Sequence, residues 1–158
     1  MNGWRLLASV AIGAWAGVLG AAPAPTVALC PSGAAGERGP WHAELAATPA
    51  QRARGFRDRP APDDHTLIYF LYRHDQTRTG FWMYQVEVPL DIAFISAAGE
   101  VLAIRTMVPC LGAPSSCPVY HAPAPYRAAL EGAAGVMARR GLAVGDTLRR
   151  CVDAAASE

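Results

Sequence analysis

The chain has 158 residues, 52% of them hydrophobic, which is enough to build one domain with its own core. All 14 basic side chains are arginines and no lysine is present, so Schiff-base catalysis and a P-loop are excluded. Beyond a leader that contains Arg5, 13 arginines balance 13 acidic residues, and no basic face for nucleic acid is expected.

The chain begins with an apolar leader. Residues 6–22 are uncharged and mostly apolar, and Arg5 precedes them, which is the pattern of a secretory signal peptide. We expect residues 1–24 to direct export to the periplasm or the exterior. Because Pro25 directly follows the small-residue cleavage site, two outcomes stay open: a cleaved signal peptide, or an uncleaved membrane anchor.

Four cysteines follow the leader, and an exported protein is expected to oxidise them to disulfides. Cys110 and Cys117 enclose the turn-rich segment LGAPSS and form the favoured pair. Cys30 and Cys151 then join the first and last strands if these strands lie side by side, and a free thiol is the alternative for either. No zinc-ligand spacing is present, so we predict neither a metal site nor a cofactor.

Beyond the leader, turn-forming residues divide the chain into short segments. Residues 25–40 are rich in Pro and Gly and are expected to be a flexible linker before a single domain at 41–152, with residues 153–158 as a disordered tail. Alternating or continuous apolar runs predict strands, at residues 41–46, 66–72, 90–96, 100–107, 126–130 and 147–152. Because these strands do not alternate with helices, we predict a mostly β, α+β fold: a small antiparallel or mixed β-barrel-like domain.

Two short helices are expected within this domain. Thr48, Pro49 and Gln51 have the spacing of a capping box with proline in the first turn, and Gly55 supplies the stop. The second helix is expected over residues 132–140. Helices this short pack against a sheet and do not form a domain.

Familiar catalytic signatures such as G-x-S-x-G and H-E-x-x-H are absent from the sequence. Asp91 lies in an apolar strand, where an unpaired charge is costly, so we expect Arg52 or Arg59 to pair with it. Glu131 is a second isolated carboxylate, and Trp82 offers a flat amphipathic ring. These five residues are the predicted ligand-binding set, and Asp91 with Glu131 is the candidate catalytic pair. A buried ion pair with a core tryptophan is the structural alternative.

Five separated motifs run in a fixed order from about residue 44 to 148. They are R-x-x-G with a following arginine (Arg52, Gly55, Arg59), F-W-M (Phe81, Trp82, Met83), P-L-D-x-x-F (Pro89, Leu90, Asp91, Phe94), L-E-x-x-x-G (Leu130, Glu131, Gly135) and G-L-x-x-G-D (Gly141, Leu142, Gly145, Asp146). Together they resemble the family named "domain of unknown function 192". The resemblance implies a small, often exported protein with a compact barrel-like domain, and no established activity.

The sequence departs from the family pattern at three places. After the F-W-M motif the family usually has Lys-Asn-Thr, whereas this chain has Tyr84, Gln85 and Val86. The family's Gly-Leu-Met becomes Gly-Phe-Arg, ending at Arg57, and its Gly-Met before the buried strand becomes His-Thr. If the family uses that lysine or asparagine for chemistry, this chain is expected to be inactive or to bind a different ligand.

The leading interpretation is an exported, non-catalytic protein that binds a small polar or carbohydrate-like ligand, or an envelope partner, near Trp82, Asp91 and Arg59. A hydrolase of envelope polymers that uses Asp91 and Glu131 is the rival enzyme hypothesis. A purely structural or interaction module is the third, and it predicts a fully buried Trp82 and no pocket. No nucleic-acid partner is expected, and membrane contact is expected only if the leader is retained.

Overall fold

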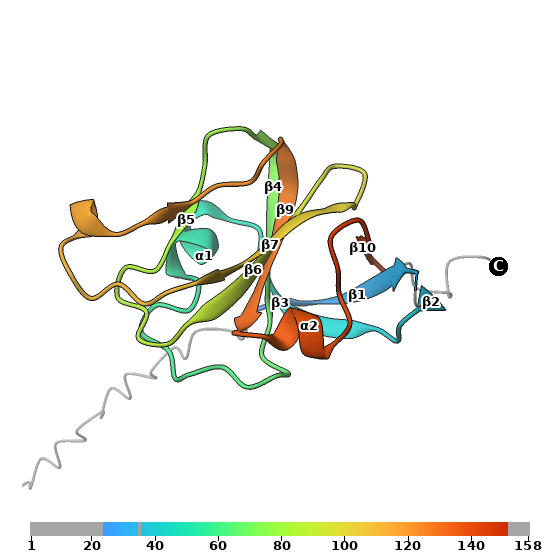
Figure 1. Cartoon of the computed structure of the whole chain (residues 1–158), viewed down its shortest axis with the longest axis horizontal. Helices are drawn as coiled ribbons and strands as arrows, with labels where there is room; N and C mark the ends of the chain where they lie inside the picture. The colour runs from blue at the N-terminus through green and yellow to red at the C-terminus, as the bar shows by residue number, and fades with distance from the viewer. Residues whose placement is uncertain (1–23, 35, 152–158) are drawn as a thin grey trace, which may run out of the picture.

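The computed structural model describes residues 24–34 and 36–151, so the predicted leader, Ala24 excepted, and the predicted tail lie outside the described residues. Strands dominate and curl into a half-barrel, which confirms the mostly β fold with two short α-helices (Figure 1). None of the helices in the described part is long and apolar enough to cross a membrane. The elements are β1 (Thr26–Gly33), β2 (Gly36–Glu37), β3 (Trp41–Ala46), α1 (Pro49–Arg54), β4 (Ile68–Gln76), β5 (Phe81–Trp82), β6 (Leu90–Ile95), β7 (Val101–Met107), the 3₁₀-helix η1 (Pro114–Ser116), β8 (Val119–Tyr120), β9 (Tyr126–Ala133), α2 (Val136–Arg139) and β10 (Thr147–Arg150).

The main sheet has the strand order β10-β1-β3-β4-β9-β6-β7, with β2 beside β1, while β5 and β8 form a separate two-stranded sheet. Its neighbours along that path are antiparallel except β3 and β4, which are parallel. Parallel neighbours need a long crossover, and α1 lies in it. This strand–helix–strand unit was not expected. A bridge between Glu100 and Thr147 joins the start of β7 to β10 and draws the ends of the sheet together.

The predicted flexible linker at residues 25–40 is wrong over residues 26–33 and again at Gly36–Glu37, which form β2 beside β1. Thr26–Gly33 form β1, which pairs with β3 on one side and with β10 on the other. Leu29 is fully buried there, and burying such a side chain contributes about 2 kcal/mol. Pro31 is tolerated because the β3 pairing has already ended at Leu29. Ladder pairing and burial therefore outweigh the Pro/Gly-rich composition, and the domain begins near residue 26.

The central strands β6 and β9, and the first three residues of β4, are buried on both faces of the sheet. Ile92 and Phe94 of β6 pack into a cluster with Phe81, and we call this side the Phe81 face. Ala93, on the other side, packs into a cluster with Met137 of α2, and we call that side the Met137 face. Covering on both sides explains why β6 is an apolar run interrupted by a single acid, Asp91.

The first helix has the predicted caps. The Gln51 amide donates to Thr48 Oγ1 at 3.2 Å, and the Thr48 amide donates to Gln51 Oε1 at 2.9 Å, so the capping box is closed. The second helix is shorter than expected and covers only Val136–Arg139. It starts late because β9 continues to Ala133, which pairs with Leu90 of β6.

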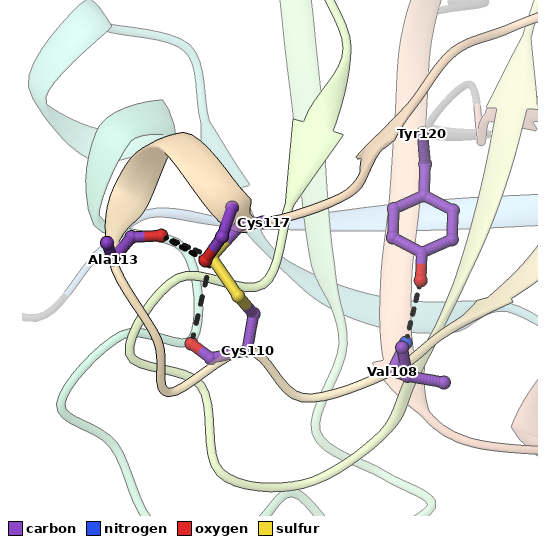
Figure 2. The surroundings of a disulfide bond; sticks show 6 residues. Val108, Cys110, Ala113, Cys117 and Tyr120 are labelled. Atoms are coloured by element: carbon purple, nitrogen blue, oxygen red, sulfur yellow. Dashed lines mark hydrogen bonds between the residues drawn. A yellow bond between two sulfur atoms is a disulfide. The ribbon is translucent and has the colours of Figure 1, made fainter.

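Both predicted disulfides are present. Cys30 of β1 pairs with Cys151, the residue after β10, so the first and last strands of the main sheet are covalently joined. Cys110 pairs with Cys117 around η1 (Figure 2), and nearby the Val108 amide donates to Tyr120 Oη at 3.0 Å. Two disulfides indicate an oxidising compartment outside the cytoplasm.

Candidate functional site

A pocket of about 320 Å³ opens between α1, residues 80–86 and the Phe81 face of the main sheet. Its volume lies at the small end of the range for ligand sites, roughly 300–1,000 Å³. Three kinds of side chain dominate its lining: aromatic rings, arginines and one acid. They are Phe56, Phe70, Tyr72, Phe81, Trp82 and Tyr84, then Arg52, Arg54 and Arg57, and finally Glu131.

The chain after α1 is shaped by Gly55. Its φ of 47° and ψ of −131° form a conformation that side chains other than glycine rarely adopt. A Cβ atom at this position would lie 3.7 Å from Glu131 Oε2. The glycine therefore ends the helix and also leaves space in front of the Glu131 carboxyl. Phe56 then turns into the core, and Arg57 returns to the pocket wall.

Trp82 and Tyr84 form the outer wall of the pocket. Their rings stack with centroids 5.4 Å apart and an interplanar angle of 29°, and the Trp82 side chain is 43% exposed. The Cys110 amide donates to the Met83 carbonyl, and the Gln85 amide donates to the Cys110 carbonyl at 3.1 Å. The disulfide loop thus holds this wall in place.

Glu131 lies at the base of the pocket. In β9 it is paired with Ile68 of β4 and Ile92 of β6, and it is only 5% exposed. Its carboxyl forms no hydrogen bond with another residue of the described chain, and burial raises its pKa to about 8. Such a carboxyl is largely protonated at neutral pH and can donate one hydrogen bond.

Arg52 of α1 lines the same pocket as Glu131. Its Nη1 donates to the carbonyl of Ala47 and to that of Leu71 at 3.0 Å, and its guanidinium lies 4.6 Å from the centre of the Tyr72 ring. These contacts fix the side chain against β4. The remaining N–H groups form no ion pair within the described chain, so Arg52 contributes positive charge to the pocket wall.

Asp91 has partners other than the predicted arginines. Its Oδ1 accepts from Thr106 Oγ1 at 2.8 Å, and its Oδ2 accepts from the Gly135 amide at 2.8 Å. Neither Arg52 nor Arg59 pairs with it, so that prediction is wrong. A cation is unnecessary because two hydrogen bonds, from β7 and from the turn before α2, satisfy the buried carboxyl. Asp91 lies outside the pocket.

Arg59 likewise pairs with a residue other than the predicted Asp91. Its guanidinium donates to both oxygens of Glu44 in β3, each at 2.7 Å, and this contact holds the pKa of Glu44 below its usual range. Three of the five predicted binding residues, Arg52, Trp82 and Glu131, are brought together in the pocket. Asp91 and Arg59 lie elsewhere.

The two candidate catalytic carboxylates lie on opposite faces of the main sheet. Glu131 is directly opposite Ile92, and Asp91 is directly opposite Gly132. Residues opposite each other in an antiparallel pair point to the same face, and successive residues alternate. Glu131 therefore points to the Phe81 face, and Asp91 points to the Met137 face. A glycosidase needs both carboxyls to flank one bond, and these two cannot.

Comparisons with known proteins bear on this site. The model of the family called domain of unknown function 192, described as an uncharacterized ACR, matches residues 32–150. The chain belongs to this family. A search of curated proteins finds no match.

Solved structures share the fold of this family member. A putative transcription regulator from Sinorhizobium meliloti 1021 is 26% identical, with a TM-score of 0.70, and the match covers 83% of this chain and 98% of that chain. A protein of unknown function from Novosphingobium aromaticivorans DSM 12444 is 27% identical, with a TM-score of 0.68, covering 94% of this chain and 99% of that chain.

The motifs of domain of unknown function 192 have two structural roles here. In the first role they support the fold: the P-L-D motif contacts the L-E-x-x-x-G motif through the Asp91–Gly135 hydrogen bond, and Asp146 of the last motif pairs with Arg38 at 2.6 Å. In the second role Arg52, Trp82 and Glu131, from three of the motifs, line the pocket. In this chain the motifs therefore combine fold-supporting contacts with a pocket.

Two departures from the family pattern contact each other. Arg57 and Tyr84 both line the pocket, and the Arg57 guanidinium lies 5.7 Å from the centre of the Tyr84 ring. A third departure, Gln85, lies at a position with a φ of 60°. Asparagine is several-fold enriched in this left-handed conformation, so the turn alone accounts for the asparagine that the family usually has there.

Sequence reasoning missed Arg57, Tyr72 and Tyr84 as pocket residues. Tyr72 belongs to the predicted strand after α1, and period-2 alternation places it on the same face as Phe70, so that signal was available. Arg57 and Tyr84 lie outside regular helices and strands, so no sequence periodicity predicts which way their side chains point. Within residues 24–34 and 36–151, no three His, Cys, Asp or Glu side chains gather to hold a metal ion.

Proposed function

We propose that this protein is an exported, extracytoplasmic binding protein whose small polar ligand occupies the pocket at Arg52, Trp82 and Glu131. The observation that supports it most is the Glu131 carboxyl, which faces the pocket while it is almost fully buried and lacks a protein partner. Buried polar groups are normally hydrogen-bonded, and a ligand in the pocket would supply Glu131 with the partner that the described chain does not.

The exposed aromatic wall favours binding over a purely structural role. A structural module would bury the Trp82 indole in the core and leave no pocket, whereas the Trp82 residue is 43% exposed and lines one. Flat aromatic rings with a polar tip contribute large contact area to ligands. The apolar leader and the two disulfides support export.

A thermal-shift screen with sugars and small polar metabolites tests the proposal. A ligand is expected to raise the melting temperature of wild type and of the control Glu37→Gln, an exposed acid in β2. The same ligand should give a reduced shift with Glu131→Leu, which has no polar side-chain atom to bind it, and with Trp82→Ala. The proposal fails if no compound stabilises wild type, or if every shift is unchanged in both pocket variants.

A further inference from the structure

Resting on that proposed function, we propose that the ligand is a small organic anion whose carboxylate or phosphate group is bound by Arg57, while its body lies against Trp82 and Tyr84. The inference comes from the charge, the hydrogen-bonding groups and the shape of the pocket wall.

The charge balance of the pocket is positive. Arg52, Arg54 and Arg57 line it, and Glu131 is the one acid among the described lining residues. None of these arginines takes part in the four ion pairs of the described chain, which use Arg38, Arg59, Arg127 and Arg139. Low-dielectric walls strengthen the field of such charges. The pocket therefore attracts anions and repels cations.

Arg57 is a half-buried arginine of the pocket whose hydrogen-bond donors are unused in the described chain. Its Nε atom is buried without a hydrogen-bond partner in the described chain, and its guanidinium makes no ion pair there. Its neighbour is the Tyr84 ring, 5.7 Å away. A guanidinium presents five N–H groups in a planar fork that matches the two oxygens of a carboxylate or phosphate.

The other two arginines of the pocket are less suited to bind the anion directly. Arg52 already donates to two backbone carbonyls, so it contributes charge more than new hydrogen bonds. Arg54 is exposed, and it also lowers the pKa of Glu44 electrostatically, so it lies at the rim. Arg57 is the arginine left to contact the anion directly.

Glu131 fits the same ligand class. In its protonated form it adds a further donor at the base of the pocket, and burial favours that form. The guanidiniums only donate hydrogen bonds, and the protonated carboxyl adds one more donor, so the matching ligand is rich in acceptors. The stacked Trp82 and Tyr84 rings give a ring-shaped or planar ligand body a flat surface to contact.

Two matched charge series test the inference by isothermal titration calorimetry on the purified, disulfide-bonded protein. The first series uses glucuronate, glucose 6-phosphate, glucose and glucosamine, and the second uses benzoate, benzyl alcohol and benzylamine. We expect the anionic member of at least one series to bind about tenfold tighter than the neutral one, as for a charge-assisted hydrogen bond. Added salt should weaken only the anionic member.

Two variants test whether Arg57 causes the tighter binding of anions. Arg57→Gln should reduce the affinity ratio between the anionic and the neutral member to about twofold or less. Arg127→Gln, which removes an exposed arginine paired with Asp75, should leave that ratio unchanged. A stronger response to the carboxylates supports the inference with a carboxylate ligand, and a stronger response to the phosphate supports it with a phosphate ligand. Unchanged melting temperatures of both variants establish that the fold is intact.

Other outcomes overturn the inference. If neutral or cationic members bind as tightly as anions, or if Arg57→Gln keeps the preference, the anion assignment is wrong, although the pocket remains a binding site. If no member of either series binds and the wider metabolite screen is also negative, the binding function and the ligand class fail together.

Discussion

Replacing Glu131 by glutamine should make the protein more stable at alkaline pH. Burial raises the pKa of Glu131 from 4.5 to about 8. Between these two pH values the folded state keeps a proton that the unfolded chain releases. The contribution of Glu131 to stability is then complete below pH 4.5, and it is lost as the pH rises to 8. Glutamine has nearly the same shape and no titration, so the variant lacks this loss.

The magnitude follows from the pKa. Each unit of pH between 4.5 and 8 removes about 1.4 kcal/mol from the free energy of unfolding of wild type relative to Glu131→Gln. The full difference above pH 8 is at most about 5 kcal/mol, and local relaxation around the carboxylate reduces it. Contributions from other titrating groups, such as Asp63 and Asp64, cancel in the comparison.

Urea unfolding at pH 5, 6.5 and 8.5, with the disulfides intact, measures this difference. The gap between Glu131→Gln and wild type should be small at pH 5 and should widen with pH in favour of the variant. A gap that stays constant from pH 5 to 8.5 would refute the reasoning, because it would mean that Glu131 ionises in the fold as easily as in the unfolded chain.

Three further predictions concern stability. Removing the Cys30–Cys151 bridge, whose cysteines are 121 positions apart, should lower the free energy of unfolding by about 5 kcal/mol. Removing the Cys110–Cys117 bridge, whose cysteines are 7 positions apart, should lower it by about half as much. Urea unfolding of the two double alanine variants measures both losses. Asp91→Ala should lower the free energy of unfolding by roughly 2–4 kcal/mol, because Thr106 and Gly135 lose their acceptor, without changing any ligand affinity; a selective loss of binding in a stable protein would contradict this. Gly55→Ala should cost about 1–3 kcal/mol at its positive φ, and calorimetry should also show weaker binding, since the added methyl group faces Glu131.

Features that depend on neighbouring residues were predictable from the sequence. The capping box at Thr48 needs only four consecutive residues, and the Cys110–Cys117 bridge spans a short loop. The β6–β7 hairpin forms between two adjacent apolar runs. In each case the interaction energy and the sequence signal lie in the same short segment.

Features set by distant strands were not predictable. Leu29 is buried because β1 inserts between β3 and β10, and no local pattern distinguishes that segment from a linker. The sequence identified Asp91 and Glu131 equally as isolated carboxylates, but their registers in β6 and β9 place them on opposite faces. One of the two hydrogen-bond partners of Asp91, Gly135, likewise lies 44 positions away along the chain.

The Cys30–Cys151 bridge makes the described domain a covalent ring. Cutting one peptide bond inside such a ring opens the backbone without separating two fragments. Proteases in the compartment outside the cytoplasm encounter exposed connections such as the polar stretch at residues 76–80. A single cut there would leave both pieces of the molecule linked, and they would separate only after reduction. The ring also suits circular permutation, with new chain ends at such a connection and the original ends joined.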